Sequence, residues 1–202
     1  MQSFSTGAAK GSMRDHYLIG TEEVAQLIKN SPANLRILNA TWFMPNQNMD
    51  AVKLHEEARL TSSTQFFDID KIALPGSNLP HTLPTAEIFT EHMKRLRVRK
   101  TDQIICYDHV GMFSVARAAW MMRYFGAENV RIMSGGLKKW TKEGRETFSG
   151  SYNDGEGLEE DGDYSYSVID ASKAFTEINE VHKLAYSVVN KISDWQITDA
   201  RA

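Results

Sequence analysis

The sequence has very little cysteine, no excess of positive charge and no long apolar run. Cys106 is the only cysteine among 202 residues, so no disulfide can form within the chain, and a reducing compartment suits it. No apolar run approaches the roughly 20 residues that a membrane-spanning helix needs. The net charge of -3 gives no electrostatic basis for binding nucleic acid or an anionic membrane. The six histidines show no metal-ligand spacing, so we predict neither a metal nor another cofactor.

The remaining composition is that of a soluble globular protein, with 42% apolar and 24% charged residues. The length suits one domain and part of another. The first fourteen residues, "MQSFSTGAAKGSMR", contain no acid and several serines, a faint likeness to a transit peptide. A polar N-terminal tail over residues 1–16 is the simpler interpretation. These features predict a cytoplasmic or mitochondrial protein.

Helix and strand patterns alternate between residues 17 and 148. Short connections between them are typical of an α/β domain with a mostly parallel sheet covered by helices on both faces. Capping residues and apolar residues at helical spacing predict helices, and short apolar runs predict strands. The expected helices are 21–30, 51–60, 86–98, 114–125 and 137–144, and the expected strands are 35–42, 64–70, 102–108 and 129–133.

A change of composition follows this domain. Residues 149–165 are rich in glycine, serine and acids, and we predict an acidic flexible linker there. Helix and strand patterns at 171–192 and 195–202 then repeat the order seen in residues 21–42, so 166–202 reads as the first helix and strand of a truncated second unit. One apolar stripe runs along that helix and predicts a protein partner or self-association through residues 170–202; its members are Phe175, Ile178, Val181, Leu184, Ala185, Val188 and Ile192.

The strongest candidate for chemistry is the loop after the most apolar strand. In open α/β sheets, ligands bind beyond the carboxyl ends of strands, where a loop meets the N-terminus of a helix. The strand ends at Asp108, and the helix starts near Ser114. A nucleophile at position 108 would face backbone N–H groups, which lower the pKa of a thiol. Aspartate accepts such hydrogen bonds, but it can form neither a persulfide nor a phosphocysteine.

Two alternatives concern this loop and the cysteine before it. Cys106 lies inside the apolar strand, which favours an inert core thiol over a reactive one. A phosphatase of similar fold would need Cys-x5-Arg, but Met112 follows Cys106 at that spacing, so this activity is excluded. Asp108 is better explained as a structural acceptor that fixes its loop than as an acid or base.

Three other polar residues near the loop have two structural interpretations each. Arg117 can bind an anion, although a salt bridge with a carboxylate is the simpler expectation. His81 and His109 lie in loops and either face a cleft or serve structural roles. Gly135 and Gly136 fit a tight turn, and Trp140 a core contact. The candidate site residues are therefore Asp108, His109, Gly111, Ser114 and Arg117, with no catalytic residue assigned among them.

In combination, these stretches resemble the first half of a tandem-domain rhodanese, the family of thiosulfate and 3-mercaptopyruvate sulfurtransferases. "ILNATW" (37–42), "FFDID" (66–70) and "LPHTLPTAEIF" (79–89) resemble the family's opening strand, second strand and following helix. The run from Tyr107 to Arg117 resembles its Y-D-x-x-G-x-F-S-A-x-R loop. "SGGLKKW" (134–140) resembles its Gly-Gly-x-x-x-Trp turn, and "TDARA" (198–202) the start of its second domain.

This resemblance implies a three-layer rhodanese-like domain of the non-catalytic type over residues 17–148. In the family, the second domain carries the cysteine that takes sulfur from the donor, and the first has aspartate there. A sulfur-donor anion would then bind only in a two-domain form. Asp108 follows Asn39 by 108 - 39 = 69 residues, and the same count from Asp199, the matching residue of the second unit, places the nucleophile near position 268. Two departures are Asn39, where an aspartate is usual, and Leu60 to Ser63, where many members have His-Ile-Pro-Gly; the second argues against substrate binding by this half.

Three functions stay open from the sequence. The chain is part of a rhodanese-type sulfurtransferase that is inactive by itself, a pseudo-rhodanese subunit of a larger assembly, or a regulatory module that holds a small anion at the Asp108 loop. The sulfur donor is thiosulfate or 3-mercaptopyruvate in the first case.

Overall fold

The computed structural model describes residues 17–153, 162–169, 176, 178–190 and 196–198. It divides into two units, Met1–Ser167 and Val168–Ala202, and each is described by itself. Among the described residues, no helix is both long and apolar enough to cross a membrane.

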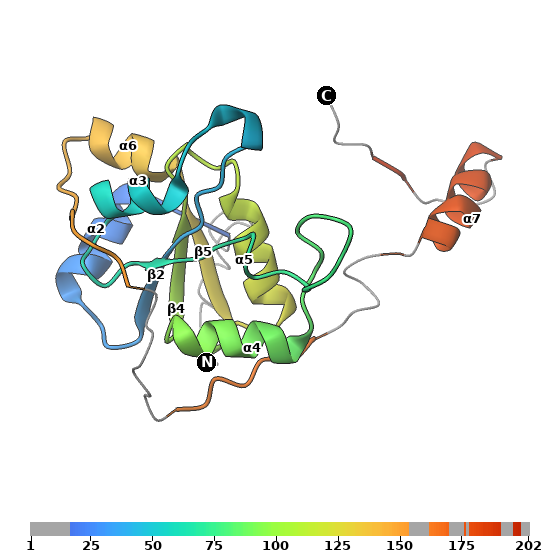
Figure 1. The fold of residues 1–202 in the computed structure, drawn as a ribbon, viewed down its shortest axis with the longest axis horizontal. Coiled ribbons are helices and arrows are strands. Elements are labelled where there is room, and N and C mark those ends of the chain that lie inside the picture. Colours follow the sequence, from blue (N-terminus) through green and yellow to red (C-terminus); the bar gives the residue numbers. More distant parts are fainter. Residues whose placement is uncertain (1–16, 154–161, 170–175, 177, 191–195, 199–202) are drawn as a thin grey trace, which may run out of the picture. The chain divides into compact units, whose positions relative to one another are not determined.

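The first unit is built on a five-stranded parallel sheet (Figure 1). The strands lie in the order β1-β5-β4-β2-β3, with every neighbouring pair parallel. β4 is the central strand, between β5 and β2, where a short apolar strand buried on both faces is expected. The bounds are β1 Leu18–Ile19, β2 Leu35–Asn39, β3 Gln65–Phe66, β4 Gln103–Tyr107 and β5 Asn129–Met133.

Helices cover both faces of this sheet, which confirms the predicted three-layer α/β fold. α4 and α5 lie on one face, and α2, α3 and α6 on the other (Figure 1). The helices are α2 Thr21–Asn30, α3 Ala51–Glu57, α4 Ala86–Arg95, α5 Val115–Tyr124 and α6 Gly136–Lys142, with a 3-10 turn η1 at Pro45–Gln47.

The side chains of β4 show why the sheet needs both layers. Ile104 and Cys106 point into the core that α4 and α5 cover, while Ile105 and Tyr107 point into the core that α2 and α6 cover. All four side chains are fully buried. Because successive residues of a strand face opposite sides, an unbroken apolar run requires cover on both.

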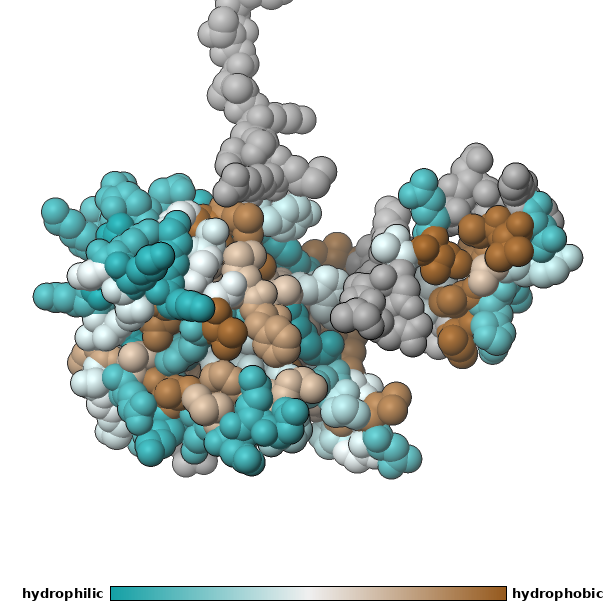
Figure 2. Space-filling view, turned by 90° about the horizontal axis from the view of Figure 1, so that it is seen from above, coloured by the Kyte–Doolittle hydropathy of each residue, from teal (hydrophilic) through white to brown (hydrophobic). Residues whose placement is uncertain are grey.

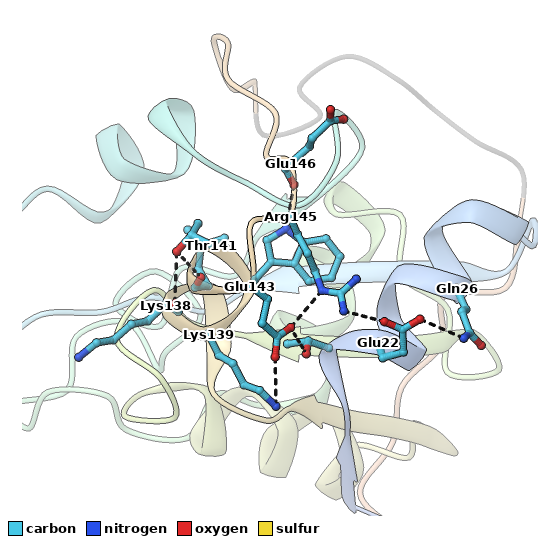
Figure 3. Close-up of polar contacts among 11 residues, drawn as sticks. Glu22, Gln26, Lys138, Lys139, Thr141, Glu143, Arg145 and Glu146 are labelled. Carbon is cyan, nitrogen blue, oxygen red and sulfur yellow. Dashed lines mark hydrogen bonds and ion pairs between the residues drawn. The ribbon is translucent and has the colours of Figure 1, made fainter.

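A polar network joins α2 to α6 at the surface (Figure 3). Arg145 binds Glu22 of α2 at 2.7 Å and Glu143 at 3.1 Å. Thr21 donates to Glu143 at 2.6 Å. These contacts lower the pKa of Glu22 and of Glu143. The network fixes the two helices that cover the same face of the sheet.

The compact unit continues to Ser167, past the expected domain end at residue 148. Tyr152 packs edge-on against His55 at 4.6 Å, and its hydroxyl accepts from the N–H of Phe66 on the edge strand β3. Tyr164 and Tyr166 are buried, and the hydroxyl of Tyr166 donates to a carbonyl that follows α4. Tyr152 and Tyr164 of the predicted linker therefore pack on the domain, as does Tyr166 from the predicted second unit, whereas residues 154–161 lie outside the described part.

In the second unit the structure describes one long helix, α7, at Ile178–Val189. None of its described side chains is buried, and Ile178 and Val189 are strongly exposed. The predicted helix was longer, 171–192, and its stripe members Phe175 and Ile192 lie outside the described residues. So does most of the predicted strand at 195–202.

Candidate functional site

The loop between β4 and α5, from Asp108 to Val115, forms a cradle of backbone N–H groups, and Asp108 occupies it. Oδ1 of Asp108 accepts from the N–H of Gly111 at 2.6 Å and of Met112 at 2.9 Å. Oδ2 accepts from Phe113 at 2.6 Å, Ser114 at 3.0 Å and Val115 at 3.2 Å. The last donor opens α5, where the helix dipole adds to the attraction for a negative charge. A side chain of the protein thus takes the place that an anion would have.

Two glycines at the start of α6, the cap Gly135 and the first helical residue Gly136, pack closely against this loop. Gly136 has φ +56°, and a Cβ there would lie 2.3 Å from the carbonyl oxygen of Asp108. That carbonyl accepts from the N–H of Leu137 at 2.8 Å. Gly111 also has a positive φ, and a Cβ there would approach the carbonyl of Gly135 to 3.2 Å. The glycine pair therefore allows close backbone approach beneath the cradle, and not only a tight turn.

Cys106 is not part of the cradle. It lies in β4, is fully buried, and belongs to the core beneath α4 and α5. Burial raises the pKa of its thiol to about 12. The predicted inert core thiol is confirmed by this position, since a thiolate rather than a thiol is the nucleophile.

His109 belongs to a buried polar cluster behind the loop. The amide nitrogen of Asn39 lies 3.0 Å from Nδ1 of His55 and 3.1 Å from Nε2 of His109. Its amide oxygen accepts from the N–H and hydroxyl of Thr41, so the nitrogen must donate to both rings. Each ring then offers a lone pair and is neutral. Burial lowers the pKa of His55 to about 3, helped by the Arg59 charge, and burial also lowers the pKa of His109. Asn39 therefore holds both rings in place behind the loop.

His81 lies on the outer side of the loop, in a different environment. Its Nε2 lies 2.6 Å from Oδ1 of Asp70, and its ring meets Trp42 edge-on at 5.1 Å. Both oxygens of Asp70 also accept from Nε1 of Trp42 at 3.2 Å. About a quarter of the His81 side chain is exposed. A hydrogen-bonded imidazole–carboxylate pair therefore lies at the surface beside the loop.

Arg117 and Ser114 reach this pair from α5. A guanidinium N–H of Arg117 donates to the backbone carbonyl of His81, where a salt bridge with a carboxylate was expected. The hydroxyl of Ser114 donates to Ala40 and accepts from the N–H of Trp42. A hollow of about 170 Å³ lies between these groups, lined by Trp42, Ile69, His81, Phe113, Ser114 and Arg117.

A second hollow of about 430 Å³ lies beyond β2 and β3 and is lined by carboxylates of Asp50, Asp68 and Asp70. Its negative charge does not favour a small anion. Leu60 is buried in the core and lines neither hollow. Among the described residues, no three His, Cys, Asp or Glu side chains come close enough together to hold a metal ion.

Of the residues expected at the site, Asp108, Gly111 and Ser114 meet in the loop, His109 turns into the buried cluster, and Arg117 faces His81. The sequence reasoning missed Asp70 and Trp42 as partners of His81. The available signal was the pair of aspartates in "FFDID" (66–70), the second of which lies eleven residues before His81. The segment between them has no regular apolar period that would have indicated the pairing.

Comparison with known proteins agrees with this architecture. Residues 53–143 match the model of the rhodanese-like domain. The chain is 36% identical over 121 residues to thiosulfate/3-mercaptopyruvate sulfurtransferase 1, mitochondrial, of Arabidopsis thaliana, covering 60% of this chain and 32% of the relative. It is 34% identical over 137 residues to human 3-mercaptopyruvate sulfurtransferase, covering 66% and 46%.

Among solved structures, SseA from Escherichia coli, described as a 3-mercaptopyruvate sulfotransferase with the rhodanese fold, matches with a TM-score of 0.73 at 26% identity. The match covers 85% of this chain and 62% of SseA. The chain spans less than half the length of the curated relatives named above. Sequence and structure agree on the same region, so residues 53–143 belong to a rhodanese-like domain.

Proposed function

We propose that this chain provides the non-nucleophilic domain of a rhodanese-type sulfurtransferase that uses 3-mercaptopyruvate or thiosulfate as sulfur donor. The observation that carries the proposal is the Asp108 carboxylate inside a cradle of five N–H groups. Such a cradle would activate a thiol, but here the position has none, and Cys106 is buried on the strand before it. The names of the relatives support the donor class.

The contribution of this domain to the reaction would come from His81 and Asp70. When a thiolate attacks the sulfur of 3-mercaptopyruvate, the carbon–sulfur bond breaks and its electron pair stays on the carbon. That carbon needs a proton, and the donor's own thiol group loses one. His81, oriented by Asp70 at 2.6 Å and partly exposed, can carry that proton between them. The nucleophile would be a cysteine that these 202 residues do not supply.

Two assays of the purified chain test the proposal. With 3-mercaptopyruvate or thiosulfate as donor and cyanide as acceptor, the chain should produce no thiocyanate above the blank. Replacement Asp108→Cys in a Cys106→Ala background should instead gain the mass of one sulfur atom after incubation with thiosulfate, because the new thiol faces the N–H cradle. Thiocyanate production by the unaltered chain that disappears in Cys106→Ala would contradict the proposal.

A second candidate function, a structural or interaction subunit, is favoured by α7. Its apolar residues Ile178, Val181, Leu184, Ala185 and Val188 recur at steps of three and four, and none of them is buried. Figure 2 shows apolar side chains gathered along this helix. We propose that a protein partner or a second copy covers this stripe. Hydrogen exchange of residues 178–190 in a monomer tests it, since strong protection would show that no partner is needed.

Localisation in mitochondria or in the cytoplasm remains a proposal. One Arabidopsis relative is named as mitochondrial, which supports the first. Fractionation of cells that express the chain with a C-terminal tag would distinguish the two.

A further inference from the structure

We propose that Arg117 is a positioning residue for His81, and that the loop from Asp108 to Val115 exists in this domain to place Arg117 and Ser114 against the His81–Asp70 pair. The importance of that pair for sulfur transfer rests on the proposed function, but its positioning does not. The loop would then have a purpose without a nucleophile: it fixes the start of α5, and α5 fixes the pair.

The first observation is the bond between Arg117 and the backbone of His81. The two residues are 36 positions apart, and Arg117 donates to the carbonyl of His81 itself. His81 has φ +57°, a left-handed conformation that is unfavourable for a non-glycine residue and persists only where the surroundings hold it. The segment that carries His81, residues 74–82, is closed by a hydrogen bond from the N–H of Leu74 to the carbonyl of Thr82. Arg117 ties this segment to α5.

The second observation is a separate path from the same helix start to Asp70. Ser114 accepts from the N–H of Trp42 at 3.1 Å and donates to the carbonyl of Ala40 at 2.7 Å, which locks the chain after β2. Trp42 in turn donates from its indole nitrogen to Asp70 and meets the ring of His81. Both members of the pair are thus held from α5: His81 by Arg117, and Asp70 through Ser114 and Trp42.

The third observation is the environment of Arg117. Arg117 is half-buried and lines the same hollow as Trp42 and Phe113, and its Nε is buried with no hydrogen-bond partner among the residues that the structure describes. Withdrawing a guanidinium from water costs free energy, so an arginine with only a helix-surface role would extend into solvent. The planar guanidinium also directs its N–H groups at fixed angles, which suits the holding of one carbonyl.

The test compares two arginines of the same helix. Arg117→Met removes the donor and keeps most of the stem, and Arg123→Met is the matched control, because Arg123 also donates to a backbone carbonyl, that of Val130, but away from the pair. The readouts are the ring ¹⁵N–¹H signals of His81 and the nuclear Overhauser effect between the rings of Trp42 and His81. In Arg117→Met we expect the ring signals to shift towards those of a free imidazole and the Overhauser effect to be lost. In Arg123→Met both should match the unaltered chain.

Unchanged ring signals and an unchanged Overhauser effect in a folded Arg117→Met variant would overturn the proposal and leave Arg117 a purely stabilising residue. If that variant does not fold, Arg117→Lys takes its place. It keeps the charge, and because a compact ammonium does not reproduce the planar donor, we expect a smaller shift in the same direction; no shift would again overturn the proposal. Neither readout needs a sulfur donor, so a failed sulfur-transfer assay leaves this result standing.

Discussion

Replacing Asp108 by asparagine tests directly whether the carboxylate holds the loop. The substitution keeps the size and shape of the side chain and replaces one oxygen by an NH₂ group. The amide oxygen can still serve the donors of one side, but the NH₂ group then points at N–H groups on the other. We expect the asparagine to turn its oxygen to the buried N–H groups of Ser114 and Val115, which have no access to water.

The size of the effect follows from which donors lose their acceptor. A buried donor without a partner costs about 1–3 kcal/mol. The N–H groups of Gly111 and Met112 face the NH₂ group instead, but residues 111–113 are partly or largely exposed, and water can satisfy their N–H groups after a small rearrangement. Loss of the negative charge at the start of α5 adds about 0.5–2 kcal/mol. The lost charge is therefore the main contribution, and we expect a loss of about 1–2 kcal/mol for Asp108→Asn. Asp108→Ala should cost about 3–5 kcal/mol, because it also leaves the buried N–H groups of Ser114 and Val115 without an acceptor.

The assay is urea unfolding followed by circular dichroism, with Asp68→Asn as the control. Asp68 also accepts from two backbone N–H groups, those of Asp70 and Lys71, but in a more open loop, and its replacement should cost less than about 1 kcal/mol. If Asp108→Asn is as stable as the control variant, the cradle is not held by the carboxylate and our account of the loop is wrong.

Three further predictions follow from the surroundings of the loop. Stability should fall as the pH drops from about 6.5 towards 3. The reason is that His55 binds a proton in the unfolded chain before it does so in the folded one, where burial lowers its pKa to about 3. The urea midpoints of the unaltered chain and of His55→Gln should diverge over that range, and parallel curves would refute this. Gly136→Ala should cost about 2 kcal/mol or more, because its Cβ would meet the carbonyl oxygen of Asp108 at 2.3 Å. Gly144→Ala has no atom within 4 Å of its Cβ and should cost only about 1 kcal/mol of backbone strain. Equal thermal midpoints of the two variants would count against the close approach at Gly136. Cys106 should react with a thiol reagent no faster than the chain unfolds, since burial raises the pKa of its thiol to about 12, and rapid labelling of the native protein would contradict that position.

The parts of the fold that the sequence predicted are those with a regular apolar period. β4 was found because four apolar residues in a row leave no polar face. β1, with only two residues, carries no such pattern and was missed. The strand expected at 64–70 ends at Phe66, because the carboxylate of Asp68 accepts from the next N–H groups and turns the chain away from the sheet. Side-chain hydrogen bonds of this kind have no period that a sequence pattern reveals.

The candidate site also contains residues that local sequence patterns predicted and residues that they did not. Asp108 was predicted correctly to lie at the start of the loop, because the end of a buried strand and the start of a helix mark the place from local patterns alone. The pairing of His81 with Asp70 depends on a loop closed between Leu74 and Thr82 and on contacts from α5, which are set by tertiary structure. The same holds for Arg117, whose expected carboxylate partner was replaced by a backbone carbonyl that the sequence does not display.

The N–H groups of residues 111–115 can serve stability or reactivity, but one side chain decides which. Hydrogen bonds from all five to a carboxylate stabilise the folded chain, and a thiolate at the same position would draw on the same donors to lower its own pKa. The sulfur atom of a cysteine is a single acceptor and does not span both sides of the cradle as two carboxylate oxygens do. Asp108→Cys should therefore be less stable than the unaltered chain even as it gains a reactive thiol. In this domain, aspartate at position 108 commits the loop to holding α5, and through Arg117 and Ser114 to holding His81 and Asp70.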